Sequence, residues 1–483
     1  MKNKSIWSYE ICGTTYESLK EDIDVDVLII GGGMTGINVA YNLLDSGLSV
    51  CLVEKNLLGS GVTSRTTGKL TYLQGDIFKI KIYQGLLKTK MYIESQIEAI
   101  NLAKKIIKKE KIDCDLEKVN SYLVADARFE RLRKNQRLLE SMGIKTFSTK
   151  SLPNENKKEK SFYVKDTYVF HPIKYIQKLA KICFDKGISI YENTKIISMT
   201  EDSDGYVCYT ENNRIRTKYV VLATHYPYFF KPFWLIFKAY LEKSYIEAFK
   251  VDKSYNFSAI SIEKPIFSMR YYSKHNLNYQ LYLSQVHNLA IKNNDEANFQ
   301  KLVNEKNTKV EYLWSNKDIM TIDSLPFIGK INNKLLIGTG YNTWGMTNGV
   351  LAGKILSDII LERENKYIEL FNPRRKSNAL VVGRAFLVMG SSLYSYMKTK
   401  IKKQKAWYSL NVKFATRKGE KVGIYIDSEK RKHIVFNKCP HMKCSLVFNE
   451  VEKTWDCPCH GSRFDIDGKC IEGPSNYDIS YKE

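Results

Sequence analysis

The chain has 483 residues, 43% of them hydrophobic, so it is long enough for two or three domains and can bury a large core. Its 27 glycines and 10 prolines exclude a collagen-like or wholly disordered chain. Lys and Arg number 75 against 52 Asp and Glu, and the resulting charge of +23 admits nucleic acid or an anionic surface as a partner. No helix-turn-helix, zinc-finger or RNP-type pattern accompanies the charge, so we expect solvated lysines and no nucleic-acid partner.

The N-terminal segment lacks the apolar core of a signal peptide, and no run of 18 apolar residues is free of charge. The nearest such run, residues 379–397, carries Arg384 in its middle. We interpret it as a buried or interfacial helix, because a charge at the centre of a membrane span is costly. We therefore expect a cytoplasmic protein without a transmembrane span.

The predicted elements begin with a β-α-β unit, in which a buried strand at 25–30 ends in three glycines, a helix covers 34–45 and a strand covers 48–53. Residues 241–290 alternate apolar and polar with many aromatics, which indicates an antiparallel sheet. Beyond a basic segment at 398–405, short strands and turns predict a small β domain. The remaining predicted elements are helices at 76–111, 172–185 and 349–361 and strands at 188–191, 219–223 and 335–338.

A glycine-rich turn joins the first predicted strand to the first helix. Gly31-Gly32-Gly33-Met34-Thr35-Gly36 fits G-x-G-x-x-G, the pattern of dinucleotide-binding turns. Gly31 makes the tight turn, Gly33 lets the backbone approach a pyrophosphate, and Gly36 lets the helix and strand pack closely. The helix N-terminus favours phosphate, and Glu54, at the end of the second strand, can accept hydrogen bonds from a ribose. These features predict a dinucleotide site.

Two further glycine-punctuated polar segments, 58–69 and 338–347, can wrap a long extended ligand. The second precedes a predicted helix whose N-terminus would stabilise negative charge at N1 and O2 of a flavin. No second G-x-G-x-x-G follows a strand in the middle of the chain, which argues against a separate NAD(P)H domain. The sequence therefore favours FAD over NAD.

These segments, with residues 223–227 and 323–329, resemble the glycine oxidase and D-amino-acid oxidase type of FAD-dependent oxidoreductase. The resemblance spans residues 25–362. It implies an α/β Rossmann-type FAD-binding domain with an inserted antiparallel-sheet substrate domain around residues 80–165 and 230–320. It also implies a set of flavin-site residues, which are Gly31, Gly33, Gly36, Glu54, Ser64, Arg65, Thr66, Gly340, Gly345, Met346 and Thr347.

Five of the ten cysteines lie beyond residue 438, which indicates a metal or cluster site. Cys439 and His441 form a C-x-H pair, and Cys457 and His460 form a C-x-x-H pair. Two thiolates and two imidazoles on two loops suit either a zinc ion or a Rieske [2Fe–2S] cluster.

This segment resembles a Rieske domain of the cytochrome bc₁/b₆f type, also at residues 455–456, 461–462, 464–465 and 473–474. The resemblance implies that Ser462 donates a hydrogen bond to a bridging sulfide, and Phe464 stands where that type carries a tyrosine donor. It implies four cluster ligands and a disulfide, namely Cys439, His441, Cys457 and His460, with Cys444 joined to Cys459.

We therefore expect an FAD-dependent oxidoreductase domain at 1–400 and a small all-β Rieske domain at 401–483. Together they predict an enzyme that contains FAD and a [2Fe–2S] cluster and oxidises a small amine or amino-acid-like substrate. The cluster would relay single electrons to or from a redox partner protein or a small electron carrier.

The alternative is an electron-transfer or redox-sensing protein without an organic substrate of its own. A Rieske oxygenase is disfavoured, because the remaining histidines are too scattered for a 2-His-1-carboxylate iron site. Two residues are candidates for catalysis. His225 follows a strand end near the expected flavin, and Arg270 would clamp a substrate carboxylate through its guanidinium.

Overall fold

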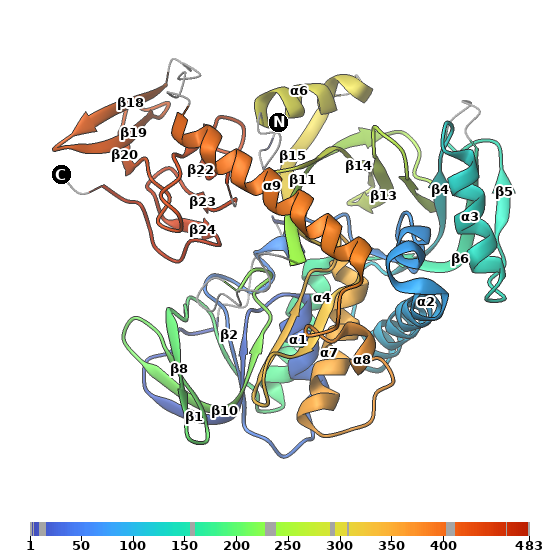
Figure 1. Ribbon diagram of the computed structural model, residues 1–483, viewed down its shortest axis with the longest axis horizontal. Helices are drawn as coiled ribbons and strands as arrows, with labels where there is room; N and C mark the ends of the chain where they lie inside the picture. The colour runs from blue at the N-terminus through green and yellow to red at the C-terminus, as the bar shows by residue number, and fades with distance from the viewer. Residues whose placement is uncertain are drawn as a thin grey trace.

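A computed structural model describes residues 2, 4–8, 16–154, 160–227, 238–289, 295–306, 309–401, 411–459 and 461–481. Its lower half in Figure 1 is built on an eight-stranded sheet with the order β16-β17-β10-β1-β2-β7, to which β9 and β8 are added beside β10. The strands are β1 (Ile23–Ile30), β2 (Val50–Val53), β7 (Ser189–Tyr191), β8 (Ser198–Asp202), β9 (Gly205–Tyr209), β10 (Arg214–Leu222), β16 (Phe327–Lys330) and β17 (Leu335–Thr339).

The four central pairs of this sheet, β17·β10, β10·β1, β1·β2 and β2·β7, are parallel. Their apolar residues are buried on both faces, which explains the near-continuous hydrophobic runs in the sequence. The helices of this half are α1 (Met34–Asn42), α2 (Phe78–Lys109), α4 (Pro172–Asp185), α7 (Gly345–Ile360), α8 (Ile368–Phe371) and the short 3-10 helix η2 (Val62–Arg65).

A nine-stranded sheet lies above this half, with the order β15-β11-β14-β13-β12-β4-β6-β3 and β5 beside β6. All its pairs are antiparallel except β12·β4. Its strands are β3 (Lys69–Leu70), β4 (Glu117–Val124), β5 (Phe147–Thr149), β6 (Ser161–Val169), β11 (Ala239–Val251), β12 (Phe257–Ser261), β13 (Ser268–Lys274), β14 (Leu277–Asn288) and β15 (Val310–Thr321), with helices α3 (Phe129–Glu140) and α6 (Asp295–Lys306) packed outside.

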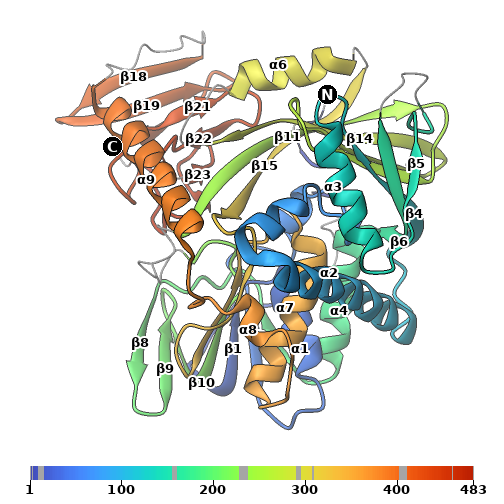
Figure 2. The same cartoon turned by 45° about the vertical axis from the view of Figure 1, so that its right-hand side comes forward.

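The C-terminal part is all β and follows the long helix α9 (Ala379–Ile401), drawn in orange in Figure 1. One of its two antiparallel sheets contains β18 (Val412–Arg417), β19 (Glu420–Ile426) and β20 (Lys432–Phe436). The other contains β21 (Val447–Asn449), β22 (Thr454–Asp456), β23 (Arg463–Phe464) and β24 (Cys470–Glu472). Figure 2 shows β11 and β15 running toward β22 and β23, so the inserted sheet ends at the C-terminal part.

The predicted fold class is confirmed, and the local predictions differ from the structure mainly at element ends. Helix α4 has the predicted bounds, whereas α7 begins at Gly345, four residues earlier than predicted. The predicted helix at 76–111 is interrupted at Gly85, where φ is 81°. A left-handed backbone angle favours glycine and kinks the helix there.

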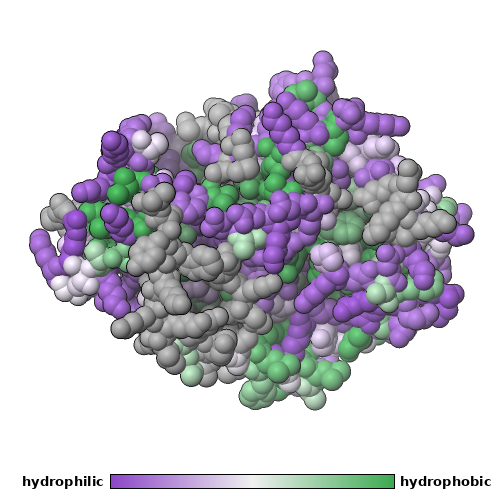
Figure 3. Space-filling view, turned by 90° about the horizontal axis from the view of Figure 1, so that it is seen from above, coloured by the Kyte–Doolittle hydropathy of each residue, from purple (hydrophilic) through white to green (hydrophobic). Residues whose placement is uncertain are grey.

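Helix α9 exposes Leu380, Phe386 and Leu387, yet it is anchored to the rest of the protein. The Arg384 guanidinium donates to the carbonyl of Ile322 at 2.6 Å, in agreement with an interfacial helix. Among the helices in the described part of the chain, none is long and apolar enough to cross a membrane. Where Figure 3 colours the face seen from above, hydrophilic residues cover more of it than hydrophobic ones, as the lysine-rich composition predicts.

Candidate functional site

The glycine fingerprint forms a cradle at the carboxyl end of β1. A Cβ atom on Gly31, whose φ is 113°, would lie 2.5 Å from the carbonyl oxygen of Ala223, and one on Gly36 would lie 1.9 Å from that of Gly31. Gly33 caps helix α1 without a side-chain hydrogen bond of its own, and the N–H of Met34, the first residue of the helix, donates to the hydroxyl of Thr63 at 3.3 Å. This geometry fits the pyrophosphate of FAD.

A cavity opens beside this cradle and contains six of the eleven predicted flavin-site residues. Within it, the Glu54 carboxylate accepts from the backbone N–H groups of Gly32 at 2.8 Å and Asn56 at 2.9 Å. These bonds hold the carboxylate at the end of β2, where a ribose is expected. The six residues are Gly31, Gly33, Glu54, Arg65, Gly345 and Met346.

The other predicted residues shape the walls of the site. The Ser64 hydroxyl donates to the carbonyl of Gly61 at 2.9 Å, and that of Thr66 accepts from the N–H of Gly68 at 3.1 Å. Gly340 has φ 71° at its turn, and Thr347 accepts at 3.3 Å from the N–H of Thr71. Gly36 lets helix α1 pack closely against the backbone of Gly31. These residues therefore hold the loops around the cavity without lining it.

Sequence reasoning missed several residues that line the same cavity, above all Lys317 and Glu472. Lys317 lies on β15 of the inserted sheet, and Glu472 lies on β24 of the C-terminal part. No local pattern marks either residue, because each reaches the cavity only through the packing of distant segments. The cavity is thus shared between the dinucleotide-binding half and the cysteine-containing part.

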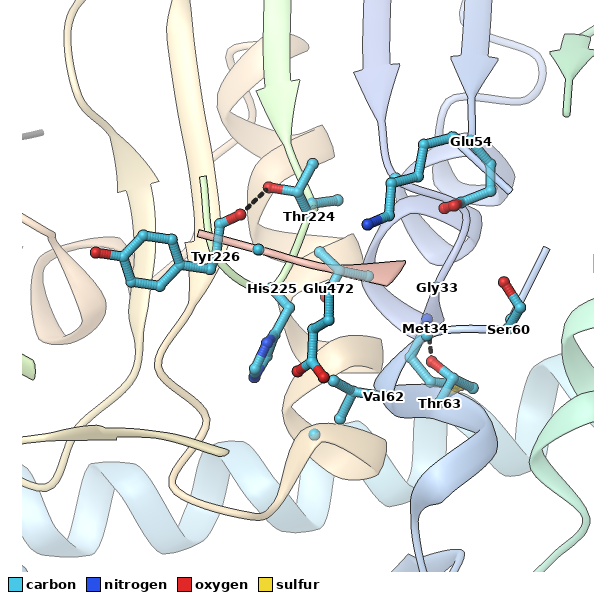
Figure 4. A pocket seen from close by; sticks show the side chains of 18 of the residues that line it. Gly33, Met34, Glu54, Ser60, Val62, Thr63, Thr224, His225, Tyr226 and Glu472 are labelled. Atoms are coloured by element: carbon cyan, nitrogen blue, oxygen red, sulfur yellow. Dashed lines mark hydrogen bonds between the residues drawn. The ribbon is translucent and has the colours of Figure 1, made fainter. Parts of the chain in front are cut away.

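His225 also lines this cavity, three residues after the end of strand β10, and has a left-handed φ of 64°. Figure 4 shows its imidazole and the Glu472 carboxylate projecting in the same direction into the cavity. Burial lowers the pKa of His225, and the negative charge of Glu472 opposes that shift. The structure therefore places His225 where the dinucleotide-binding half meets the C-terminal part.

Arg270 has a different place from the one predicted. Its side chain is buried, and one terminal nitrogen donates to the carbonyls of Thr67, Gly68 and Phe170 at 2.9–3.1 Å. Its Nε donates to the carbonyl of Tyr271 at 3.0 Å, and the residue does not line the cavity beside the fingerprint. Arg270 therefore ties two loops to β13 and is not placed to clamp a carboxylate.

The cysteine–histidine motifs form two facing loops. In the first loop the N–H of Cys439 donates to the carbonyl of Cys444, and in the second the N–H of Cys457 donates to the carbonyl of Ser462. A disulfide joins Cys444 to Cys459 and so links the two loops. His460 lies outside the described residues.

The donor set of these loops suits an iron–sulfur cluster. The thiol of Cys457, the N–H groups of His441 and Met442 and the hydroxyl of Ser462 hydrogen-bond to Cys439 and lower its pKa to about 6, although burial opposes the shift. Thiolates are the ligands that iron in such clusters requires. The sulfurs of Cys444, Cys457 and Cys459 lie within 4.8 Å of one another, and two of them form the disulfide.

Buried charges join the C-terminal part to the inserted sheet and to η2. The Lys317 ammonium donates to the carbonyl of Gly461 and lies 3.4 Å from the Glu472 carboxylate. Arg65 lies 3.6 Å from Glu452, and Lys243 lies 3.3 Å from Asp456. Arg463 lies 2.9 Å from Glu452 and 3.2 Å from Asp456 within the C-terminal part. Since each of these cations has an anionic partner, the interface satisfies its buried charges.

Two family models match the chain, "FAD dependent oxidoreductase" at residues 26–261 and "Rieske [2Fe-2S] domain" at residues 399–481. The chain is 28% identical to the Rieske 2Fe-2S iron-sulfur protein YhfW of Bacillus subtilis, over 98% of this chain and 96% of that protein. It is 23% identical to gamma-glutamylputrescine oxidoreductase of Escherichia coli, over 79% of this chain and 94% of that protein.

Two solved structures share the fold of the larger part. Glycine oxidase from Geobacillus kaustophilus has a TM-score of 0.60 at 16% identity, covering 73% of this chain and all of that one. L-amino acid deaminase from Proteus vulgaris has a TM-score of 0.58 at 16% identity, covering 76% of this chain and all of that one.

Proposed function

The chain joins an FAD-dependent oxidoreductase domain to a Rieske [2Fe–2S] domain, and on this premise we propose that it oxidises a small amine or amino-acid-like substrate and exchanges the electrons internally between its two cofactors. When bound, FAD accepts a hydride equivalent and the cluster carries one electron at a time. We place the boundary between the two functional parts at residues 400 and 401, close to the start of the Rieske match.

The observation that carries this proposal is the shared cavity. Glu472 of the Rieske domain lines it together with Gly31 and Gly33 of the fingerprint. Lys317 lines it as well and bonds to Gly461, which adjoins the second motif of the Rieske domain. A Rieske domain that only served an external partner would have no need of buried ion pairs to the inserted sheet.

The residues of this chain have distinct roles in the proposal. The fingerprint glycines and Glu54 would hold the adenosine half of FAD, and the residues of the turn at 340–347 would contribute to the site of its ring. Cys439, His441, Cys457 and His460 hold the cluster, and the disulfide between Cys444 and Cys459 fixes their loops. Lys317, Glu472 and His225 exclude water between the two sites and hold their relative position.

The alternative of a carrier without an organic substrate has less support. A second cavity of about 400 Å³ lies beside the turn at 342–344, which leads into the flavin-site residues Gly345 and Met346. A cavity of this volume accommodates a small molecule. The similarity to gamma-glutamylputrescine oxidoreductase supports an amine as that molecule.

The proposal is tested with the purified protein under anaerobic conditions. Its absorption spectrum and iron content establish both cofactors, and a panel of amines and amino acids is then added. We expect one class of compound to bleach the flavin and to produce the electron paramagnetic resonance signal of a reduced Rieske cluster. A flavin that is reduced while the cluster stays oxidised contradicts internal electron exchange, and a flavin that responds to no member of either class contradicts the proposed substrate.

A further inference from the structure

The second cavity lies on the face of the inserted sheet where β11 pairs with β15. Its lining also includes Arg65 of η2, which reaches the first cavity, and the apolar side chains of Ile260, Ile262 and Leu283. The cavity therefore combines an apolar wall with a polar wall provided by two neighbouring strands. The polar wall indicates which ligand chemistry the cavity accepts.

Two carboxylates face each other on this polar wall. Glu242 on β11 is directly opposite Asp318 on β15, and both line the cavity. Like charges in this position destabilise a sheet unless something neutralises them. Burial raises the pKa of Glu242, and burial followed by the charge of Glu242 raises that of Asp318 to about 7. Among the described residues, neither carboxylate forms a salt bridge, although Asp318 accepts from Asn316 at 2.9 Å and Glu242 accepts from the hydroxyl of Tyr240 at 3.3 Å.

The neighbouring pair on the same face supplies an independent observation. Ser244 on β11 is directly opposite Asn316 on β15, and their exposed fractions are only 5% and 7%. The Ser244 hydroxyl and the Asn316 side-chain oxygen line the cavity without a hydrogen-bond partner among the described residues. The side-chain nitrogen of Asn316 donates to Asp318 at 2.9 Å, so its oxygen is the atom left without a partner. Unsatisfied buried polar atoms are costly, and because the Asn316 oxygen can only accept, it points to a ligand that donates at least one hydrogen bond.

The basic residues around the cavity are largely engaged elsewhere. Arg65 lies against Glu452, and Arg384 of α9 donates to Ile322 and to the hydroxyl of Tyr240. Arg128 is exposed to solvent. Lys79 of α2 also lines the cavity; burial and the charge of Arg384 lower its pKa, and the charges of Glu242 and Asp76 oppose that shift. A carboxylate ligand would be repelled by the two carboxylates of the polar wall. An ammonium ligand could instead donate hydrogen bonds to both carboxylates and to the side-chain oxygen of Asn316.

We propose that this cavity binds the ammonium group of an amine substrate between Glu242, Asp318 and the side-chain oxygen of Asn316. This inference rests on the proposed function, in which the cavity is the substrate site. It narrows the substrate class to cationic amines. An ammonium has three N–H donors, which matches three acceptor groups. The Ile260, Ile262 and Leu283 wall then packs against the carbon chain of the amine.

The test uses the oxidised FAD-loaded full-length protein and needs no turnover. Butylamine, butanol and butyrate have similar carbon chains but carry a positive charge, no charge and a negative charge. Each is titrated while the change in flavin absorption is recorded. We expect butylamine to bind with a Kd about tenfold or more below those of butanol and butyrate, since hydrogen bonds to charged groups are the stronger ones.

Two isosteric variants identify the acceptors. Glu242→Gln and Asp318→Asn should each raise the Kd of butylamine about tenfold or more and leave that of butanol within about twofold. Glu311→Gln is the matched control, because Glu311 also lies on β15 but lines neither cavity. Asn316→Leu, which keeps the volume but removes the oxygen, should weaken butylamine as well. The FAD content of each variant shows that it is folded.

The outcomes separate this inference from the proposed function. Tighter binding of butyrate than of butylamine, or an unchanged butylamine Kd in both acid variants, overturns the inference even if the protein is an oxidase. Charge-selective amine binding that never leads to flavin reduction by any amine supports the inference and contradicts the proposed substrate oxidation.

Discussion

The Lys317 ammonium, on a strand of the inserted sheet, donates a hydrogen bond to the backbone carbonyl of Gly461 in the second cysteine loop of the Rieske domain. Gly461 has φ 74°, and a Cβ atom on it would lie 2.8 Å from Leu289 and 3.2 Å from the Lys317 side chain. The cysteine loop therefore packs directly on the inserted sheet. Lys317 also lines the cavity of the dinucleotide fingerprint, so one side chain contacts both functional regions.

Replacing Lys317 should loosen this contact. In Lys317→Met the chain length is similar, but the buried Glu472 carboxylate loses the ammonium that lies 3.4 Å away. Removing one partner of a buried ion pair costs about 3–5 kcal/mol, so the midpoint of thermal unfolding should fall by several degrees. Lys250→Met is the control, because its pair with Glu311 is at the surface and contributes about 0–1 kcal/mol. Equal effects of the two variants would show that Lys317 does not hold the interface.

The interface should also weaken in acid. Burial alone would raise the pKa of Glu472. The positive charges of Lys317, Arg65 and Arg463 outweigh burial and lower this pKa from 4.5 to about 2. A carboxyl group with a lowered pKa contributes stability that is present above about pH 4.5 and is lost as the pH falls toward 2. The shift corresponds to roughly 3 kcal/mol.

Thermal unfolding followed between pH 6 and 2 measures this loss. Glu472→Gln should have a flatter dependence in that window, because its amide does not titrate. The same pH dependence in the variant and the parent protein would assign the loss to other carboxyl groups.

The cluster should be removable without loss of the flavin. Cys439→Ala and Cys457→Ala each delete a thiolate from the buried loops, so iron should be absent from both variants. The fingerprint lies in a separate sheet, and the flavin absorption should persist. Iron analysis and the visible spectrum of each variant check this. Loss of both cofactors would mean that the two parts do not fold independently of the cluster.

Side chains near the cluster should set its reduction potential. The Ser462 hydroxyl hydrogen-bonds to Cys439, and such bonds stabilise the reduced, more negative cluster. Phe464 is fully buried in the core of the Rieske domain and offers no donor. Rieske potentials span roughly −150 to +300 mV, and we expect this one between those limits. Protein-film voltammetry should show a lower potential for Ser462→Ala and a higher one for Phe464→Tyr. No response to either variant would assign the potential to burial or net charge.

Local patterns were sufficient to predict the dinucleotide fingerprint, helix α4 and the two cysteine loops. Each depends on residues close together in the sequence, where spacing alone specifies a turn or a helix face. Arg270 shows the limit of this reasoning. Its residue type suits a carboxylate clamp, but the position of β13 directs its side chain to the carbonyls of Thr67 and Gly68.

The same limit applies to the charged interface and to the polar wall of the second cavity, neither of which could be predicted from the sequence. Glu242 and Asp318 are opposite each other only because β11 and β15 pair in one particular register. Glu472 reaches the cavity of Gly31 only because the Rieske domain packs on the inserted sheet. Pairing and packing of distant segments leave no local pattern in a single sequence.

The central claim is that flavin and cluster exchange electrons within one chain, and flash photoreduction of the flavin tests it most directly. The absorbance of the flavin and that of the cluster are followed after the flash at several protein concentrations. The account predicts that the cluster is reduced as the flavin is reoxidised, at a rate that does not depend on protein concentration. A rate that rises in proportion to concentration, or a cluster that stays oxidised, would contradict it.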